Sequence, residues 1–251
     1  MIPKIIHQTW KNKDIPDKWK TYHQSWKDNF PEPEYKHILW TDNDNRNLIK
    51  KNYDWFLETY DNYPKNIQRA DAVRYFILYH YGGIYADLDC EVRENFYEEL
   101  SKDKINLAES PYLAGTTMNN LMASNKHNEL WLDVFNNLED KKNITATIAS
   151  TGPAILNILK EEDIRILDVD NYNPLKKRPW WRHHIENTFF TKLDLEKSKN
   201  WDNAKVVHYG TESWAWEEIK HDTNFAYVFL ILVFICFLIY FLVKIYRKNK
   251  K

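Results

Sequence analysis

The sequence has few cysteines and no surplus of charge of one sign. Its two cysteines, Cys90 and Cys236, are too remote from each other to form a disulfide framework. Lys and Arg (35 residues) are balanced by Asp and Glu (36 residues), and the body of the chain has no long basic block. Because binding to a nucleic-acid backbone needs a basic surface, nucleic acid is not an expected partner.

Signals that would target or divide the chain are also missing. Residues 1–7 lack the basic start and the apolar core of a signal peptide. No repeat or linker interrupts the chain before its C-terminal apolar run. We therefore expect residues 1–220 to form one compact domain.

Aromatic residues, in contrast, are abundant, with 11 Trp and 16 Tyr. Their amphipathic rings suit a sugar-binding cleft and a membrane-proximal surface equally well, so composition leaves both open.

Residues 225–243 form one continuous apolar run without a charged residue. As a helix this run would span roughly 28 Å, about the thickness of a bilayer core. We expect a transmembrane helix over 225–243, followed by a basic tail over 244–251. The positive-inside rule places that tail in the cytoplasm and the body across the membrane. The absence of a signal peptide favours the competing arrangement, a C-terminal anchor with a cytosolic body.

Strand and helix patterns alternate along the body, which predicts an α/β sandwich with a largely parallel sheet. In such folds the ligand crevice lies beyond the C-terminal ends of the strands, where Asp89 and His208 would both lie. The expected strands cover 4–10, 35–40, 84–89, 105–108, 164–169 and 205–208. The expected helices begin at Pro16 and at Thr41 or Asp42, cover 67–81 and 128–138, and follow Gly152.

The run from Gly82 to Asp89 ends an apolar strand with two carboxylates, Asp87 and Asp89. Side chains two apart on a strand share a side, so both acids can converge on one ion while Leu88 turns into the core. Hard oxygen ligands of this kind suit Mg²⁺ or Mn²⁺.

The preceding helix places Asp71 and Arg74 three residues apart on one face, close to the two acids. A surface ion pair is one interpretation of this spacing. We favour a contact with substrate, because the helix runs directly into the acidic motif.

Three blocks together resemble glycosyltransferase family 32, the D-x-D group that includes yeast Golgi mannosyltransferases and mannosyltransferases of inositol phosphorylceramide. They are residues 2–10, residues 69–89 and residues 206–214. The resemblance spans most of residues 2–216. It implies a GT-A-type, Rossmann-like fold, a GDP- or UDP-hexose donor, and transfer with retention of configuration to a glycan or glycolipid.

The same resemblance implies roles for individual residues. It implies that the first strand, two residues of the helix before the acidic motif and a late loop bind the donor. It also implies that the two acids of the motif and a late histidine hold a metal ion. The donor-binding residues are His7, Gln8, Trp10, Asp71, Arg74, Ser213 and Trp214; the catalytic residues are Asp87, Asp89 and Arg74; the metal ligands are Asp87, Asp89 and His208.

Several alternatives stay open. A neutral imidazole at His208 would favour Mn²⁺ over Mg²⁺, whereas His7 and Trp10 could equally be core residues. Residues 176–184 suit either an acceptor site or a membrane surface. A glycoside hydrolase would also need two carboxylates, about 5 to 9.5 Å apart, but no metal. A catalytically silent carbohydrate-binding membrane protein is the remaining alternative.

Overall fold

The computed structural model describes residues 1–111, 115–174 and 203–210, which fall within a compact unit from Met1 to Gly210. None of the helices among these residues is long and apolar enough to cross a membrane. The expected membrane span over 225–243, the basic tail, residues 176–184, Ser213 and Trp214 lie outside the described residues.

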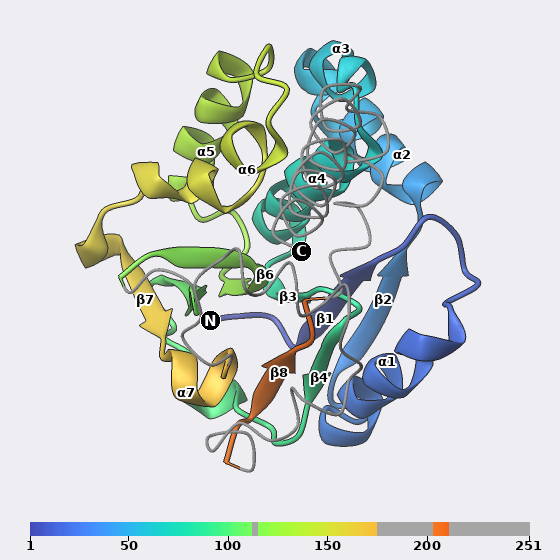
Figure 1. Cartoon of the computed structure of the whole chain (residues 1–251), viewed down its shortest axis with the longest axis vertical. Helices are drawn as coiled ribbons and strands as arrows, with labels where there is room; N and C mark the ends of the chain where they lie inside the picture. Colours follow the sequence, from blue (N-terminus) through green and yellow to red (C-terminus); the bar gives the residue numbers. More distant parts are fainter. Residues whose placement is uncertain (112–114, 175–202, 211–251) are drawn as a thin grey trace, which may run out of the picture. The chain divides into compact units, whose positions relative to one another are not determined.

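A six-stranded sheet forms the centre of this unit, in the order β2-β1-β3-β6-β5-β7 (Figure 1). Within the described part of the chain five of these strands run parallel, and β6 runs antiparallel to both of its neighbours. The expected α/β fold with a mostly parallel sheet is therefore confirmed. The strands are β1 (Ile5–Thr9), β2 (Lys36–Trp40), β3 (Gly83–Ala86), β5 (Ile105–Glu109), β6 (Thr117–Ser124) and β7 (Ile164–Leu167).

Two further strands, β4 (Cys90–Val92) and β8 (Val206–His208), pair antiparallel in a separate small sheet. This sheet corrects one expectation. His208 ends a strand, as predicted, but that strand does not belong to the parallel sheet.

Helices cover both faces of the large sheet. On one face α4 packs against β1, β3 and β6, and α2, α3 and α5 pack against α4 or its neighbours; α1 lies on the other side, against β4 (Figure 1). The helices are α1 (Asp17–Asn29), α2 (Asp42–Asn52), α3 (Asp54–Asn62), α4 (Asn66–Tyr81), α5 (Leu130–Asp140), α6 (Thr147–Ser150) and α7 (Val169–Tyr172). The segment expected as a helix after Gly152 is a 3₁₀ helix, Pro153–Ile158.

Side chains of β3 alternate between the two cores, as the period of a strand requires. Tyr85 packs into the core under α4, whereas Ile84 and Ala86 pack into the core on the α1 side. Because β3 is packed on both faces, the position of its C-terminal end is fixed. The acidic motif begins directly after that end.

The expected helix N-terminus at residue 41 is also confirmed. Thr41 caps α2: its side chain accepts a hydrogen bond from the Asp44 backbone N–H, and the Asp44 side chain accepts one from the Thr41 N–H. This reciprocal capping satisfies two backbone donors at the start of the helix. The helix then packs against α4, the helix that leads into β3 and the acidic motif.

Gly82 and Gly83 connect α4 to β3 with positive φ angles of 64° and 102°. These angles are costly for residues with a side chain. At Gly83 a Cβ atom would also meet the backbone carbonyl oxygen of Ile5 and would lie 3.2 Å from His7 Nε2. The joint between helix and strand thus depends on glycine for both conformation and space.

We expect Gly83→Ala to lower the free energy of unfolding by about 3 kcal/mol, because backbone strain and overpacking add. Chemical denaturation measures this loss. Gly115→Ala is the matched control: its φ is 78°, but no atom of the described residues outside its immediate neighbours lies within 4 Å of the added Cβ. It should cost about 1 kcal/mol, from backbone strain alone. Equal losses in the two variants would contradict the close approach at Gly83.

Candidate active site

The acidic motif forms a tight turn directly after β3. The Cys90 N–H donates to the Asp87 carbonyl oxygen at 3.0 Å, which turns the chain from β3 into β4. Asp87 and Asp89 therefore lie on a turn and not on a continuous strand, which corrects the expected local geometry. Leu88 between them is 5% exposed and packs with residues of α1 and β8, as predicted.

Asp87 is held from three sides. Its Oδ1 accepts a hydrogen bond from the Tyr85 hydroxyl at 2.9 Å and lies 3.1 Å from Arg74 Nη1. Its backbone N–H donates to the carbonyl oxygen of Asn120 on β6 at 2.8 Å. Burial raises the pKa of Asp87, and the charge of Asp89 raises it further, against the lowering by Arg74 and His208. Asp87, Asp89 and His208 therefore lie close enough for their charges to affect one another.

Arg74 is a buried connector. Its guanidinium contacts Asp71 Oδ1 at 2.8 Å, Asp87 Oδ1 at 3.1 Å and the Asn119 carbonyl oxygen at 2.8 Å, and it lies over the Tyr85 ring. The Arg74 side chain is 4% exposed, so the interpretation as a surface ion pair is wrong. Arg74 holds Asp71 and Asp87 in fixed positions, and its predicted contact with substrate stays a prediction.

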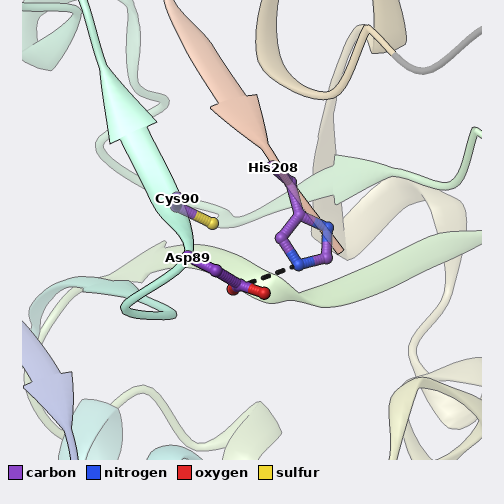
Figure 2. A group of neighbouring side chains, drawn as sticks. All are labelled: Asp89, Cys90 and His208. Carbon is purple, nitrogen blue, oxygen red and sulfur yellow. Dashed lines mark ion pairs between the residues drawn. The ribbon is translucent and has the colours of Figure 1, made fainter. Parts of the chain in front are cut away.

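Asp89 meets His208 across the small sheet (Figure 2). The pairing of β4 with β8 sets Cys90 opposite His208, and Asp89 Oδ1 lies 3.4 Å from His208 Nε2. Figure 2 shows the Asp89 carboxylate and the Cys90 sulfur both directed toward the His208 ring. Among the described residues these three side chains form a group whose potential metal-ligating atoms lie within 4.8 Å of one another.

The residues present fit a divalent cation. Among the described residues three carboxylates, Asp71, Asp87 and Asp89, lie at the site, and Arg74 contacts two of them, Asp71 and Asp87. Asp89 supplies an oxygen and His208 a nitrogen at one point, a set that Mn²⁺ accepts. Asp87 lies outside this group, since its carboxylate is engaged by Arg74 and Tyr85. Its role as a metal ligand stays a prediction.

His7 lies fully buried on the α4 side of β1. The Trp40 indole, which can only donate, points its Nε1 at His7 Nδ1 at 3.1 Å, so this ring nitrogen must be the acceptor. His7 Nε2 then donates to the Gly82 carbonyl oxygen at 2.9 Å. Burial lowers the pKa of His7 from about 6.5 to about 4. His7 thus links the joint between α4 and β3, through Nε2, to Trp40 on β2, through Nδ1.

This lowered pKa predicts a pH dependence of stability. Between pH 6.5 and 4 the unfolded chain binds a proton at His7 that the folded chain does not, so stability falls as pH falls through that window. The loss approaches about 3 kcal/mol. Urea denaturation of the wild type and His7→Gln across this range measures the loss. The variant should lack this part of the slope, and parallel curves would contradict it.

Gln8 and Trp10, also predicted to bind the donor, point to the α1 side. Gln8 Oε1 lies 2.6 Å from His23 Nδ1, and Trp10 packs edge-on against Trp19. Gln8 Nε2 and Trp10 Nε1 are buried without a hydrogen-bond partner in the described part of the chain. The structure therefore separates His7 from Gln8 and Trp10, and their roles toward a donor stay predictions.

Sequence reasoning missed several residues that hold the site. Thr9 Oγ1 lies 2.9 Å from the Tyr85 hydroxyl, which links β1 to Asp87. Asn119 donates to Asp71 Oδ1 at 3.2 Å, and Asn120 contacts Cys90 Sγ at 3.6 Å. Tyr85 could have been found, because strand alternation sets it on the same side as Asp87. Two adjacent asparagines inside an otherwise apolar segment were the available signal for β6.

Comparison with known proteins identifies relatives of this chain. Residues 16–110 match the family described as "Glycosyltransferase sugar-binding region containing DXD motif". The chain is 41% identical over 220 residues to inositol phosphoceramide mannosyltransferase 2 of Schizosaccharomyces pombe, covering 85% of this chain and 58% of the relative. It is 35% identical over 214 residues to mannosyl phosphorylinositol ceramide synthase SUR1 of Saccharomyces cerevisiae, covering 82% and 54%. The chain thus spans little more than half the length of these relatives.

Solved structures agree on the fold. The glycosyltransferase GlyE of Streptococcus pneumoniae superimposes with a TM-score of 0.51 and 16% identity, over 83% of this chain and 55% of that one. The glycosyltransferase domain of the YGT toxin gives 0.51 and 10%, over 66% and 80%. At these identities the likeness concerns the fold alone. The sequence matches confirm the predicted resemblance: residues 16–110 of this chain match the glycosyltransferase family with the DXD-containing sugar-binding region.

Proposed function

We propose that this protein is a metal-dependent mannosyltransferase that moves mannose from a nucleotide diphosphate sugar to a glycolipid, with retention of configuration. The observation that carries the proposal is the convergence of Asp89 and His208, 3.4 Å apart, beside Asp87 and the buried Arg74. The choice of mannose and of an inositol-phosphoceramide acceptor rests on the names of the two fungal relatives.

The site residues divide into two groups. Asp89 and His208 would hold the divalent ion, which supplies Lewis-acid stabilisation of the charge that develops on the leaving diphosphate. Arg74, Tyr85 and Asn119 keep Asp71 and Asp87 in place, so that the negative side of the site is preorganised. Preorganisation matters because the dipoles and charges then need no rearrangement during the reaction.

A membrane location also belongs to the proposal. The apolar run 225–243 is long enough for a single span, and a glycolipid acceptor resides in a bilayer. The aromatic and cationic residues of 176–184 suit the surface of that bilayer. The protein would therefore act on an acceptor in the membrane that anchors it.

Purified full-length chain in detergent, with inositol phosphoceramide as acceptor, tests the function. We expect transfer of mannose from GDP-mannose in the presence of Mn²⁺, loss of transfer with a chelator, and recovery when Mn²⁺ is restored; transfer from a UDP-hexose instead would replace mannose as the proposed sugar. The anomeric configuration of the product, measured by NMR, tests retention. Chelator-resistant hydrolysis of a glycoside without transfer would replace the proposal by a hydrolase.

A further inference from the structure

The site contains a sulfur atom that the proposed function does not use. Cys90 is fully buried, and Figure 2 shows its Sγ directed toward the same space as the Asp89 carboxylate and the His208 ring. The sequence alone gave this cysteine no role. Its position follows from the register of the small sheet, in which Cys90 lies directly opposite His208.

The sulfur is weakly engaged. Among the described residues its hydrogen-bond contacts are with Asn120, whose carbonyl oxygen lies 3.7 Å and whose Nδ2 lies 3.6 Å from Sγ, while Cys90 also packs in the core on the α1 side. Asn120 is 1% exposed, and its Oδ1 has no hydrogen-bond partner among the described residues. The residue that contacts the thiol thus carries a buried acceptor that a ligand of this corner would satisfy.

The donor set determines which ions the corner can take. A carboxylate alone suits Mg²⁺, Mn²⁺ and Ca²⁺, an imidazole adds nitrogen, and a thiolate shifts preference toward Zn²⁺ and other thiophilic ions. Two donors on one such ion lie about 3 to 4 Å apart. The atoms of Asp89, Cys90 and His208 lie within 4.8 Å of one another, so small side-chain rotations suffice to close a shared site.

We propose that Cys90 is a sulfur ligand of the metal site formed with Asp89 and His208, so that the site binds Zn²⁺, Co²⁺ and Cd²⁺ in competition with Mn²⁺. Binding breaks the thiol S–H bond, forms a metal–sulfur bond and releases the proton to the buffer. The inference deepens the proposed function and rests on its metal site. Zn²⁺ would then displace Mn²⁺ from the enzyme.

Titration of the metal-free full chain with Co²⁺ tests the proposal by absorption, without turnover. The probe variant is Cys236→Ser, in which Cys90 is the remaining cysteine of the sequence. We expect this variant and the wild type to show the same near-ultraviolet sulfur-to-cobalt charge-transfer band. In Cys90→Ser the band should vanish. The affinity for Cd²⁺ should fall by at least about 10-fold, whereas the affinity for Mn²⁺ should change by less than about 3-fold.

The outcomes are distinguishable. One outcome is that Cys236→Ser shows the cobalt d–d bands without the charge-transfer band, and that Asp89→Asn loses the d–d bands. This outcome would overturn the sulfur ligand and leave the proposed function intact. No Co²⁺ binding at all would overturn the inference and metal dependence together. Because the first arm uses the protein with Cys90 unchanged, the test stands even where Cys90→Ser fails to fold.

Discussion

Replacing Asp89 by Asn should reduce the proposed mannosyl transfer by about 10³-fold at saturating donor, because the site loses the charged oxygen that would hold the divalent ion. The side chain keeps its size, so the turn after β3 is expected to stay intact. Near-ultraviolet circular dichroism should therefore match the wild type. Isothermal titration should show Mn²⁺ binding weakened together with the loss of turnover.

Glu91 supplies the matched control for this loss. It is the next acidic residue on β4, and its Oε2 accepts a hydrogen bond from the Tyr209 hydroxyl at 2.7 Å outside the group of metal-ligating atoms. Glu91→Gln removes one negative charge two residues further along the chain. We expect turnover within about threefold of the wild type, because general charge is screened in solvent. Similar losses in both variants would mean that Asp89 acts through charge alone.

The elements with strong local patterns could be predicted from the sequence. The 16-residue helix α4 has no internal Gly or Pro and ends at Gly82, and its expected range differs from the observed one by a single residue. The aromatic residues Trp19, Tyr22 and Trp26 recur at helical spacing and are buried on α1, as expected. In both cases periodicity and capping agree with the tertiary packing.

Strand β6 could not be predicted because its sequence contradicts its position. It lies between β3 and β5 in the sheet, yet its middle carries Asn119 and Asn120, residues that are rare in strands. Both asparagines are buried and hydrogen-bonded to the site. The local pattern therefore fails where a central strand gives up apolar packing to hold the acidic residues, as happens at functional sites.

The sequence also could not show how His208 reaches Asp89. Their alignment depends on the pairing of β4 with β8, two three-residue strands separated by more than half of the domain's length. Such short strands have little pattern of their own, and their register is a long-range property. The resemblance to a family suggested a late histidine ligand, but only the structure shows Cys90 beside it.

Arg74→Met should be the most destabilising single change at this site. It leaves the buried Asp71 and the partly exposed Asp87 without the guanidinium that contacts both, at 2.8 and 3.1 Å. Breaking a buried pair in this way costs about 3 to 5 kcal/mol, since an uncompensated charge remains in the interior. Urea denaturation measures the loss. It should shrink from neutral to mildly acidic pH, because the pKa of Asp87, already raised by burial, rises further without Arg74 and protonation removes the charge.

The chain contains a second arginine–carboxylate pair that serves as the control. Arg46 contacts both carboxylate oxygens of Asp61 at 2.8 and 2.7 Å, but the two side chains are 46% and 38% exposed. Arg46→Met should cost no more than about 1 kcal/mol, because water solvates the carboxylate that remains. Adding Asp87→Asn to Arg74→Met should recover part of the loss, which a double-mutant cycle measures. Equal costs at Arg46 and Arg74, or no recovery in the double variant, would show that Arg74 contributes packing and not charge compensation.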